Sequence, residues 1–192
     1  MTVLPQPPAQ LLTVAEYAAL GEIESGYAEL LEGRLLMSPS PVPDHNVASL
    51  ELAVRLRPQV PGHLEVIQDV DVDLQLVSAD QPGFSRRPDL TIVDRAARWR
   101  VRNEGGMLRA SEVLVVVEIV SPGSRRTDYV VKRGEYADAG IAHYWIVDLT
   151  DPISLVDCHL AHGFGYQDPG AVTGVFTTTE PFPVRVELDR LL

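Results

Sequence analysis

Residues 113–120 read VLVVVEIV and are the most strongly β-branched run of the chain. A short continuous apolar run of this kind predicts a central strand that is buried on both faces of a sheet. The Ser121-Pro122-Gly123 segment follows directly and predicts the end of that strand. The one charged residue inside the run is Glu118, so the stretch is a candidate for function as well as for the core.

The segments that follow predict a strand–helix–strand unit. Residues 127–139 have the pattern of a helix, and Gly140 stands where a C-cap glycine is expected. Residues 142–147, AHYWIV, predict a second buried strand. Two strands joined by a crossover helix form a right-handed parallel unit. The sequence therefore predicts an α/β fold around this unit.

The N-terminal region predicts a short helix and a hairpin. Residues 14–20 follow Thr13 as a candidate N-cap, and Glu16 lies three residues after it, as in a capping box. Residues 27–37 read YAELLEGRLLM, two short apolar runs on either side of Glu32-Gly33. This pattern predicts a β-hairpin with a tight turn at that pair.

The middle of the chain predicts a helix and two strands. Asp44 is a candidate N-cap for a helix that Pro58 would end. Residues 66–77, VIQDVDVDLQLV, alternate apolar and acidic side chains for most of their length and predict one half-buried strand. Residues 88–93, PDLTIV, predict a short strand, and residues 95–112 predict a loop or a broken helix.

The rest of the chain, after residue 148, predicts three or four short strands, because turn residues interrupt it repeatedly. No internal repeat or interdomain linker is visible, so we expect a flexible Pro-rich tail over residues 1–12 and a single domain over 13–192. The predicted architecture is α/β, with a mixed central sheet flanked by helices and with extra N- and C-terminal β-hairpins.

Length and composition exclude several classes of protein. The 192 residues are 45% apolar and 22% charged, which is typical of a globular domain. Cys158 is the only cysteine, so neither an intramolecular disulfide nor a cysteine-rich zinc site can form. The N-terminus has no secretory pattern, and no apolar run reaches the roughly 20 residues that a membrane span needs. We therefore expect a cytoplasmic protein.

The net charge of −11 is unusual for a protein that binds nucleic acid, since Lys and Arg normally neutralise the phosphates. Acidic groups that surround a metal repel phosphate only until the metal binds. Several arginines lie within one short stretch: Arg86, Arg87, Arg95, Arg98, Arg100, Arg102 and Arg109. This stretch could be a solvated loop or a contact with nucleic acid.

Glu118 and Asp89 form a candidate metal site. A carboxylate inside an apolar strand is normally paired, protonated or bound to a metal, although Glu118 could also turn to solvent or meet an arginine. Asp89 begins the predicted strand after Pro88, and taken alone it reads as a turn residue. If the two strands are neighbours, the two carboxylates converge and repel each other unless a proton or a cation lies between them. Mg²⁺ prefers such oxygen ligands and keeps several waters.

The predicted helix after Glu118 carries a third candidate. Asp128, Lys132 and Tyr136 are spaced i, i+4, i+8 and therefore share one helix face. Asp128 and Lys132 could simply form a weak ion pair, and Tyr136 could simply pack on the sheet. Lys132 is the only lysine among sixteen basic residues. A lysine over a metal site can orient the attacking water or stabilise charge on a phosphate.

These pieces, in their order and spacing, resemble the Uma-type putative restriction endonuclease family, a branch of the PD-(D/E)XK nucleases. The resemblance covers roughly residues 12–150. It rests on R-PD-L, V-V-V-E-I-V-S-P, D-x-x-x-K-x-x-x-Y and G-I-A-H-Y-W-I-V-D, on the upstream T-V-A-E-Y and Y-A-E-L-L-E-G-R-L-L-M-S-P segments, and on His45.

The resemblance implies a restriction-endonuclease-like core in which Asp89 and Glu118 bind the metal. In the general PD-(D/E)XK pattern a lysine lies two residues after the second acid, but this position is Val120 here. Lys132 would therefore reach the site from the helix. Glu29 and His45 lie where the family has recurring polar residues. Glu29 could add a metal ligand or be an exposed hairpin residue, and His45 could be a general base, a phosphate contact or only the start of a helix.

The expected function is that of a Mg²⁺- or Mn²⁺-dependent endonuclease that hydrolyses phosphodiester bonds in DNA, with Asp89, Glu118, Lys132 and His45 as the catalytic set. Cutting both strands of a duplex needs two sites, which favours a homodimer. One alternative is a non-catalytic nuclease-fold protein that binds nucleic acid or a protein partner. Another is a metal-dependent phosphohydrolase of small molecules, which a closed pocket would indicate. No dinucleotide-binding, P-loop or nucleophile-elbow motif is present.

Overall fold

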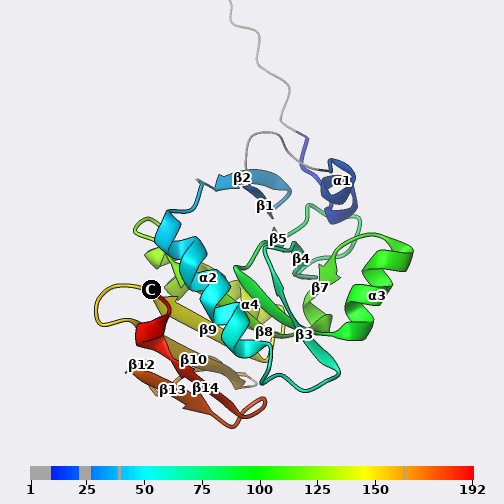
Figure 1. Ribbon diagram of the computed structural model, residues 1–192. Helices are drawn as coiled ribbons and strands as arrows, with labels where there is room; N and C mark the ends of the chain where they lie inside the picture. The colour runs from blue at the N-terminus through cyan, green and yellow to red at the C-terminus, as the bar shows by residue number, and fades with distance from the viewer. Residues whose placement is uncertain (1–9, 22–26, 39, 162) are drawn as a thin grey trace, which may run out of the picture.

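The computed structural model describes residues 10–21, 27–38, 40–161 and 163–192 (Figure 1). The predicted tail therefore lies mostly outside the described residues. Its end does not: the Leu12 N–H donates to the Gly33 carbonyl at 2.8 Å, and the Leu12 carbonyl accepts from the Gly83 N–H at 2.9 Å. The packed part of the chain thus begins before the predicted boundary at residue 13.

A mixed sheet forms the centre of the protein, as predicted. Within the described residues it has seven strands in the order β11-β10-β9-β8-β6-β3, with β12 paired to β10. Only β8 and β9 are parallel to each other; the other pairs are antiparallel. The bounds are β3 Leu64–Gln68, β6 Leu90–Asp94, β8 Val113–Val120, β9 His143–Asp148, β10 Ser154–Ala161, β11 Gly165–Gln167 and β12 Ala171–Thr173.

The strand–helix–strand unit predicted around residues 113–147 is confirmed. The crossover begins as a π-helix, η2 (Thr127–Lys132), and continues as α4 (Arg133–Asp138). Gly140 follows with a φ of 77°, the left-handed conformation that favours glycine at a helix end. Short π-helical stretches often occur at functional sites because they change which side chains share a face.

A second sheet packs beside the first, in the order β2-β1-β5-β4-β7. The predicted hairpin is present, with Glu32 and Gly33 at φ values of 49° and 74° in its turn. A Cβ on Gly33 would lie 2.8 Å from the Pro82 Cβ, so this position requires glycine. The bounds are β1 Tyr27–Leu31, β2 Arg34–Ser38, β4 Val72–Asp73, β5 Ser85–Arg86 and β7 Leu108–Arg109.

The prediction of one strand over residues 66–77 is wrong. The chain leaves the large sheet after β3, takes a left-handed conformation at Asp69 with a φ of 49°, and joins the second sheet as β4. The acidic–apolar alternation continues through this break, so periodicity alone gives no sign of the change of sheet. A single left-handed residue redirects the strand.

The helices differ from the prediction mainly at their ends. The capping box of Thr13 and Glu16 is present at α1 (Val14–Ala19). Helix α2 (Pro43–Leu56) begins one residue before the predicted cap, with Val42 as N-cap and Asp44 inside the first turn. The reason is Pro43, whose fixed φ and missing N–H suit the first helical position. The broken helix predicted over 95–112 is α3 (Arg95–Glu104), followed by β7 and a short 3₁₀ turn, η1 (Ala110–Glu112).

The C-terminal part has more strands than the three or four predicted. After β12 it adds β13 (Val175–Thr178) and β14 (Val184–Glu187), which form the predicted C-terminal hairpin, and the 3₁₀ turn η3 (Leu188–Arg190). Within the described ranges, none of the helices combines the length and the apolar character that a membrane crossing requires.

Apolar residues fill both faces of the large sheet. On one face, α2 and the β13–β14 hairpin cover β8 and β9, and Leu52, Trp145 and Phe176 meet in this core (Figure 1). On the other face, α3, α4 and the second sheet pack over the same strands around Tyr136 and Tyr144. Strand β8 is therefore enclosed from both sides, as its sequence predicts, and Glu118 must find a partner inside the protein.

A buried arginine joins the second sheet to α4. Arg86 of β5 is 1% exposed. It donates to Glu29 of β1 at 2.7 Å and to both carboxylate oxygens of Glu135 of α4 at 2.7 Å. Such a group is tolerated in the interior because two carboxylates surround it.

The buried face of α2 provides a stability prediction. We expect Leu52→Ala to lower the free energy of unfolding by about 2–5 kcal/mol, because Leu52 is fully buried and its loss leaves a cavity. Val54→Ala on the exposed face of the same helix is the matched control and should change it by less than about 0.5 kcal/mol. Urea denaturation of both variants measures the difference. Equal effects would contradict the orientation of α2.

A second prediction concerns Arg86. We expect Arg86→Met to destabilise the fold by about 3–5 kcal/mol, because Glu29 and Glu135 lose their charged partner inside the protein. Arg98→Met removes a half-exposed ion pair with Glu65 and should cost less than about 1 kcal/mol. Thermal and urea unfolding of the two variants compares them. A tolerated Arg86→Met would mean that the bridge contributes no net stability.

Candidate functional site

One cleft contains all the residues that the sequence analysis assigns to catalysis or metal binding. It has a volume of about 550 Å³ and lies between β1, the first turn of α2, the end of β8 and η2. Glu29, His45, Asp89, Glu118 and Lys132 all line it. Residues that are up to 103 positions apart along the chain, from Glu29 to Lys132, therefore meet in one place.

Asp89 lies just before β6 and reaches across to the end of β8. Its Oδ2 accepts a hydrogen bond from the Ile119 N–H at 2.6 Å and lies 3.2 Å from His45 Nε2. Since Ile119 follows Glu118 directly, this bond holds Asp89 beside the second acid. Among the described residues, no donor contacts Asp89 Oδ1. Asp89 thus has one anchored oxygen and one that is available in the cleft.

Glu118 is buried and meets a lysine, so it neither turns to solvent nor pairs with an arginine. Its Oε1 accepts from Lys132 Nζ at 2.8 Å and from the Tyr136 hydroxyl at 2.6 Å. Its Oε2 has no hydrogen-bond partner in the described part of the chain. Burial, with a smaller contribution from Asp89, raises the pKa of Glu118 to about 8, although Lys132 acts to lower it. Glu118 would therefore gain from a cation near Oε2.

Lys132 stands at the centre of a group of carboxylates. Its Nζ lies 2.8 Å from Glu118, 3.3 Å from Glu29 and 3.9 Å from Asp128. Burial alone would lower the pKa of Lys132, but these carboxylates outweigh burial and raise it. The lysine is therefore charged, and it comes from the π-helical segment η2 rather than from the position two residues after Glu118.

Glu29 holds the lysine and the buried arginine together. Its Oε2 accepts from Arg86 at 2.7 Å, and its Oε1 accepts from the Arg87 N–H at 3.2 Å and lies 3.3 Å from Lys132 Nζ. Burial acts to raise the pKa of Glu29, but Lys132 and Arg86 outweigh it and hold this pKa below its usual value. Glu29 is 5% exposed, so the alternative of an exposed hairpin residue is wrong. Both of its oxygens already have partners, and the metal-ligand role expected from the resemblance stays a prediction.

His45 lies in the first turn of α2 and faces Asp89. The hydrogen bond to Asp89 raises the pKa of His45, although burial acts in the opposite direction. Its Nδ1 is buried and has no hydrogen-bond partner among the described residues. In this arrangement the protonated imidazole is favoured, which suits a phosphate contact better than a general base.

Two residues contribute to the site beyond the expected catalytic and metal-binding set. Tyr136, which could have been only a packing residue, donates its hydroxyl to Glu118. Asp69 lines the cleft, and its N–H donates to the Asp89 carbonyl at 3.3 Å. The i, i+4 spacing of Lys132 and Tyr136 was an available signal for the first. For Asp69 there was none, because its position depends on the left-handed turn between the two sheets.

Most of the arginine-rich stretch lies outside the cleft. Of its members, Arg87 alone lines the cleft. Arg98 and Arg100 on α3 pair with Glu65 and Glu112. The interpretation as a solvated segment therefore fits α3 better than that of a nucleic-acid contact at the site.

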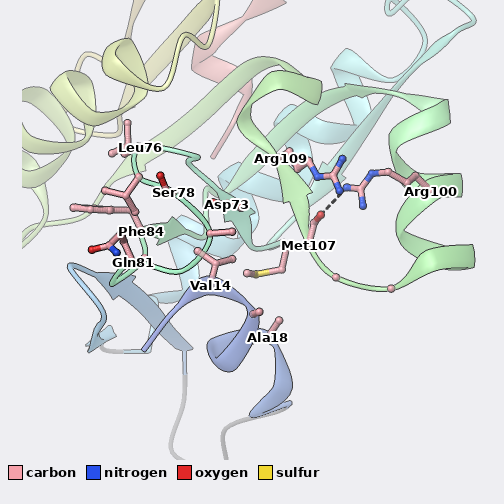
Figure 2. A pocket seen from close by; sticks show the side chains of 16 residues that line it. Val14, Ala18, Asp73, Leu76, Ser78, Gln81, Phe84, Arg100, Met107 and Arg109 are labelled. Carbon is pink, nitrogen blue, oxygen red and sulfur yellow. Dashed lines mark hydrogen bonds between the residues drawn. The ribbon is translucent and has the colours of Figure 1, made fainter. Parts of the chain in front are cut away.

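A second hollow, of about 260 Å³, lies between α1, the β4–β5 connection and the end of α3 (Figure 2). Its walls are largely apolar, and Arg100 is held there by a hydrogen bond to the Met107 carbonyl at 2.7 Å. It contains one carboxylate, Asp73, and no lysine. This hollow therefore lacks the group of carboxylates and lysine that lines the larger cleft.

The donor set fits a hard cation in part. No three His, Cys, Asp or Glu side chains of the described ranges are arranged to hold a metal ion together. Mg²⁺, however, is usually bound by one or two carboxylates, with waters and substrate phosphate completing its shell. Asp89 Oδ1 and Glu118 Oε2 provide two available carboxylate oxygens in one cleft. The residues thus fit a sparsely coordinated Mg²⁺ or Mn²⁺.

Comparisons with known proteins identify the family and the fold of the chain. A crystal structure of a putative nuclease belonging to DUF820, from Anabaena variabilis ATCC 29413, superimposes with a TM-score of 0.69 at 16% sequence identity. The match covers 94% of this chain and 97% of that chain, and at this identity it shows a shared fold. No curated protein matches. Residues 14–188 match the Uma2 family, described as "Putative restriction endonuclease". The chain therefore belongs to the Uma2 family.

Proposed function

We propose that the protein is a divalent-metal-dependent endonuclease that hydrolyses phosphodiester bonds in DNA, on a restriction-endonuclease-like core. The observation that carries this proposal is the meeting of Asp89, Glu118 and Lys132 in one cleft. Family membership and the fold both support it. Val120 occupies the position where the general PD-(D/E)XK pattern has a lysine. Lys132 would take the place of that lysine, since its Nζ lies 2.8 Å from Glu118.

Asp89 and Glu118 would hold Mg²⁺ or Mn²⁺ through their available oxygens. Such a cation supplies a Lewis acid for the scissile phosphate and lowers the pKa of bound water. The burial of Glu118 and the anchoring of Asp89 by the Ile119 N–H fix where these oxygens point. A site whose ligands are fixed before the substrate arrives loses little free energy to reorganisation.

The protein side chains have distinct roles in this hydrolysis. A water oxygen forms a bond to phosphorus and gives up a proton, while the bond from phosphorus to the leaving deoxyribose oxygen breaks and that oxygen takes up a proton. Lys132 would donate to a non-bridging phosphate oxygen and stabilise the growing negative charge. His45, held by Asp89, would contact the neighbouring phosphate. Glu29 and Asp128 would hold the Lys132 ammonium group in position when no substrate is bound.

The non-catalytic alternative has two observations in its favour. Lys132 is bound to three carboxylates, and the described residues hold no three-ligand metal cluster. A protein that kept the fold and lost the activity would show the same packing. The small-molecule phosphohydrolase receives less support, because exposed residues such as Met37 and Val42 line the cleft and open it to solvent. A homodimer remains our proposal for cutting both strands of a duplex.

Cleavage of plasmid, linear and single-stranded substrates with Mg²⁺ or Mn²⁺ tests the proposal. We expect Asp89→Asn, which keeps the shape of the side chain, to lower the rate on the order of a hundredfold or more, equivalent to about 3 kcal/mol of transition-state stabilisation. Asp80→Asn removes the same charge at an exposed position outside the cleft and should leave the rate unchanged. Full cleavage by Asp89→Asn would refute the assignment, and no cleavage by the unaltered protein on any substrate would favour the non-catalytic alternative.

A further inference from the structure

The cations of the cleft are already neutralised. Among the described residues that line it, Lys132 and Arg87 are the only lysine and arginine. Lys132 is surrounded by Glu118, Glu29 and Asp128. Arg87 forms two hydrogen bonds to Asp71, at 2.9 and 2.7 Å. A polyanion therefore finds no unpaired Lys or Arg in this cleft.

Carboxylates outnumber these cations. The lining residues include the acidic side chains of Glu29, Asp69, Asp89, Glu118 and Asp128. Proteins that bind duplex DNA through its backbone normally place several Lys or Arg side chains against successive phosphates. The cleft has the opposite charge, apart from two neighbouring positions: a cation between Asp89 and Glu118 would meet one phosphate, and His45, which is paired with Asp89, would contact the next. Such a site offers fewer phosphate contacts than backbone binding of a duplex normally uses.

The outer wall of the cleft is apolar instead. Leu36 and Met37 of β2 are each 44% exposed, and Val42, just before α2, is 47% exposed. All three line the cleft beside the carboxylates. Large apolar side chains that remain exposed together at a cleft mark a surface for an apolar ligand face.

A planar group completes this wall. Tyr27 of β1 is 41% exposed and lines the cleft. The guanidinium of Arg87 lies over its ring, 5.2 Å from the centroid, and is itself held by Asp71. Aromatic rings and guanidinium planes that are fixed in this way are platforms on which nucleic-acid bases stack.

We infer that the substrate of this site is single-stranded nucleic acid, or a single-stranded segment within a duplex. This inference rests on the proposed function and narrows its substrate class to an unpaired strand, whose cleavage needs one site and therefore does not require the homodimer. In a duplex the faces of the bases are stacked on one another and only their edges are accessible in the grooves, so the base faces cannot pack on the apolar wall. An unpaired strand places one phosphate at Asp89 and Glu118 while its neighbouring bases pack on Leu36, Met37 and Tyr27. Binding then depends on base contacts more than on charge.

Equilibrium binding separates this inference from catalysis. The probes are fluorescein-labelled DNA and RNA oligonucleotides of about 12 nucleotides, single-stranded and as duplexes of the same sequence, measured by anisotropy with Ca²⁺ and with a chelator. We expect the single strands to bind about tenfold more tightly than the duplex, since one stacked base contributes on the order of 1–3 kcal/mol. The slope of log K against log salt should stay below about 2 in magnitude, as few phosphates are neutralised.

The exposed strand β2 offers matched variants. Leu36→Ser should weaken single-strand binding about tenfold and abolish the preference over duplex. Leu35→Ser is the control: Leu35 has the neighbouring position on β2 and 43% exposure, but it does not line the cleft. Unfolding transitions of both variants verify that they remain folded. Arg102→Ala tests whether the exposed arginines of α3 bind the oligonucleotide instead. The inference predicts that this variant binds single strands as tightly as the unaltered protein.

Three results would overturn the inference: tighter or equal binding of duplex, no binding of any oligonucleotide, or equal losses in Leu35→Ser and Leu36→Ser. Equal losses would instead indicate that β2 is a contact between copies of the chain. Cleavage is measured separately on the same oligonucleotides. If single strands bind preferentially but are not cleaved, the inference about the substrate stands and the proposed endonuclease activity fails. If only the duplex is bound and cleaved, the endonuclease activity stands and the inference fails.

Discussion

The buried contact between Lys132 and Glu118 is the interaction on which the site depends. A carboxylate inside strand β8 is costly without a partner, and so is an ammonium group inside the protein. The two become tolerable only because Lys132 Nζ lies 2.8 Å from Glu118 Oε1, with Tyr136 donating to the same oxygen. To make this contact, η2 must fold back over the end of β8. Glu29 must also approach from the second sheet, which Arg86 ties to α4.

The same contact explains how a strongly acidic chain can hold a site for phosphate. Lys132 balances carboxylates until substrate arrives, and the oxygens that it leaves available on Glu118 and Asp89 are those a divalent cation would need. The net charge of −11 then keeps polyanions away from the rest of the surface. Recognition would come from the metal position and from the apolar wall formed by β2 and Tyr27.

Local sequence signals predicted those parts of the fold that local physics determines. The β-branched run at 113–120 had to be a buried strand, and the Glu32-Gly33 turn had to be a hairpin. The strand over 66–77 was wrong because a tertiary change of sheet at Asp69 leaves no trace in the alternation. The residues of the site could be named, since an acid in an apolar strand and a solitary lysine are both anomalies. The contacts of these residues could not be predicted. The π-helical turn of η2 and the hydrogen bonds of Arg86 to Glu29 and Glu135 follow from packing between distant segments.

Calorimetric titration of chelator-treated protein with Mn²⁺ tests whether Asp89 and Glu118 form a metal site. The titration is made alone and with a bound single-stranded oligonucleotide, because substrate phosphate can complete the coordination. Saturable binding in the unaltered protein and in Asp80→Asn, with its loss in Asp89→Asn, is the expected result. Equal binding in Asp89→Asn, or no binding even with the oligonucleotide present, would contradict a metal site in this cleft.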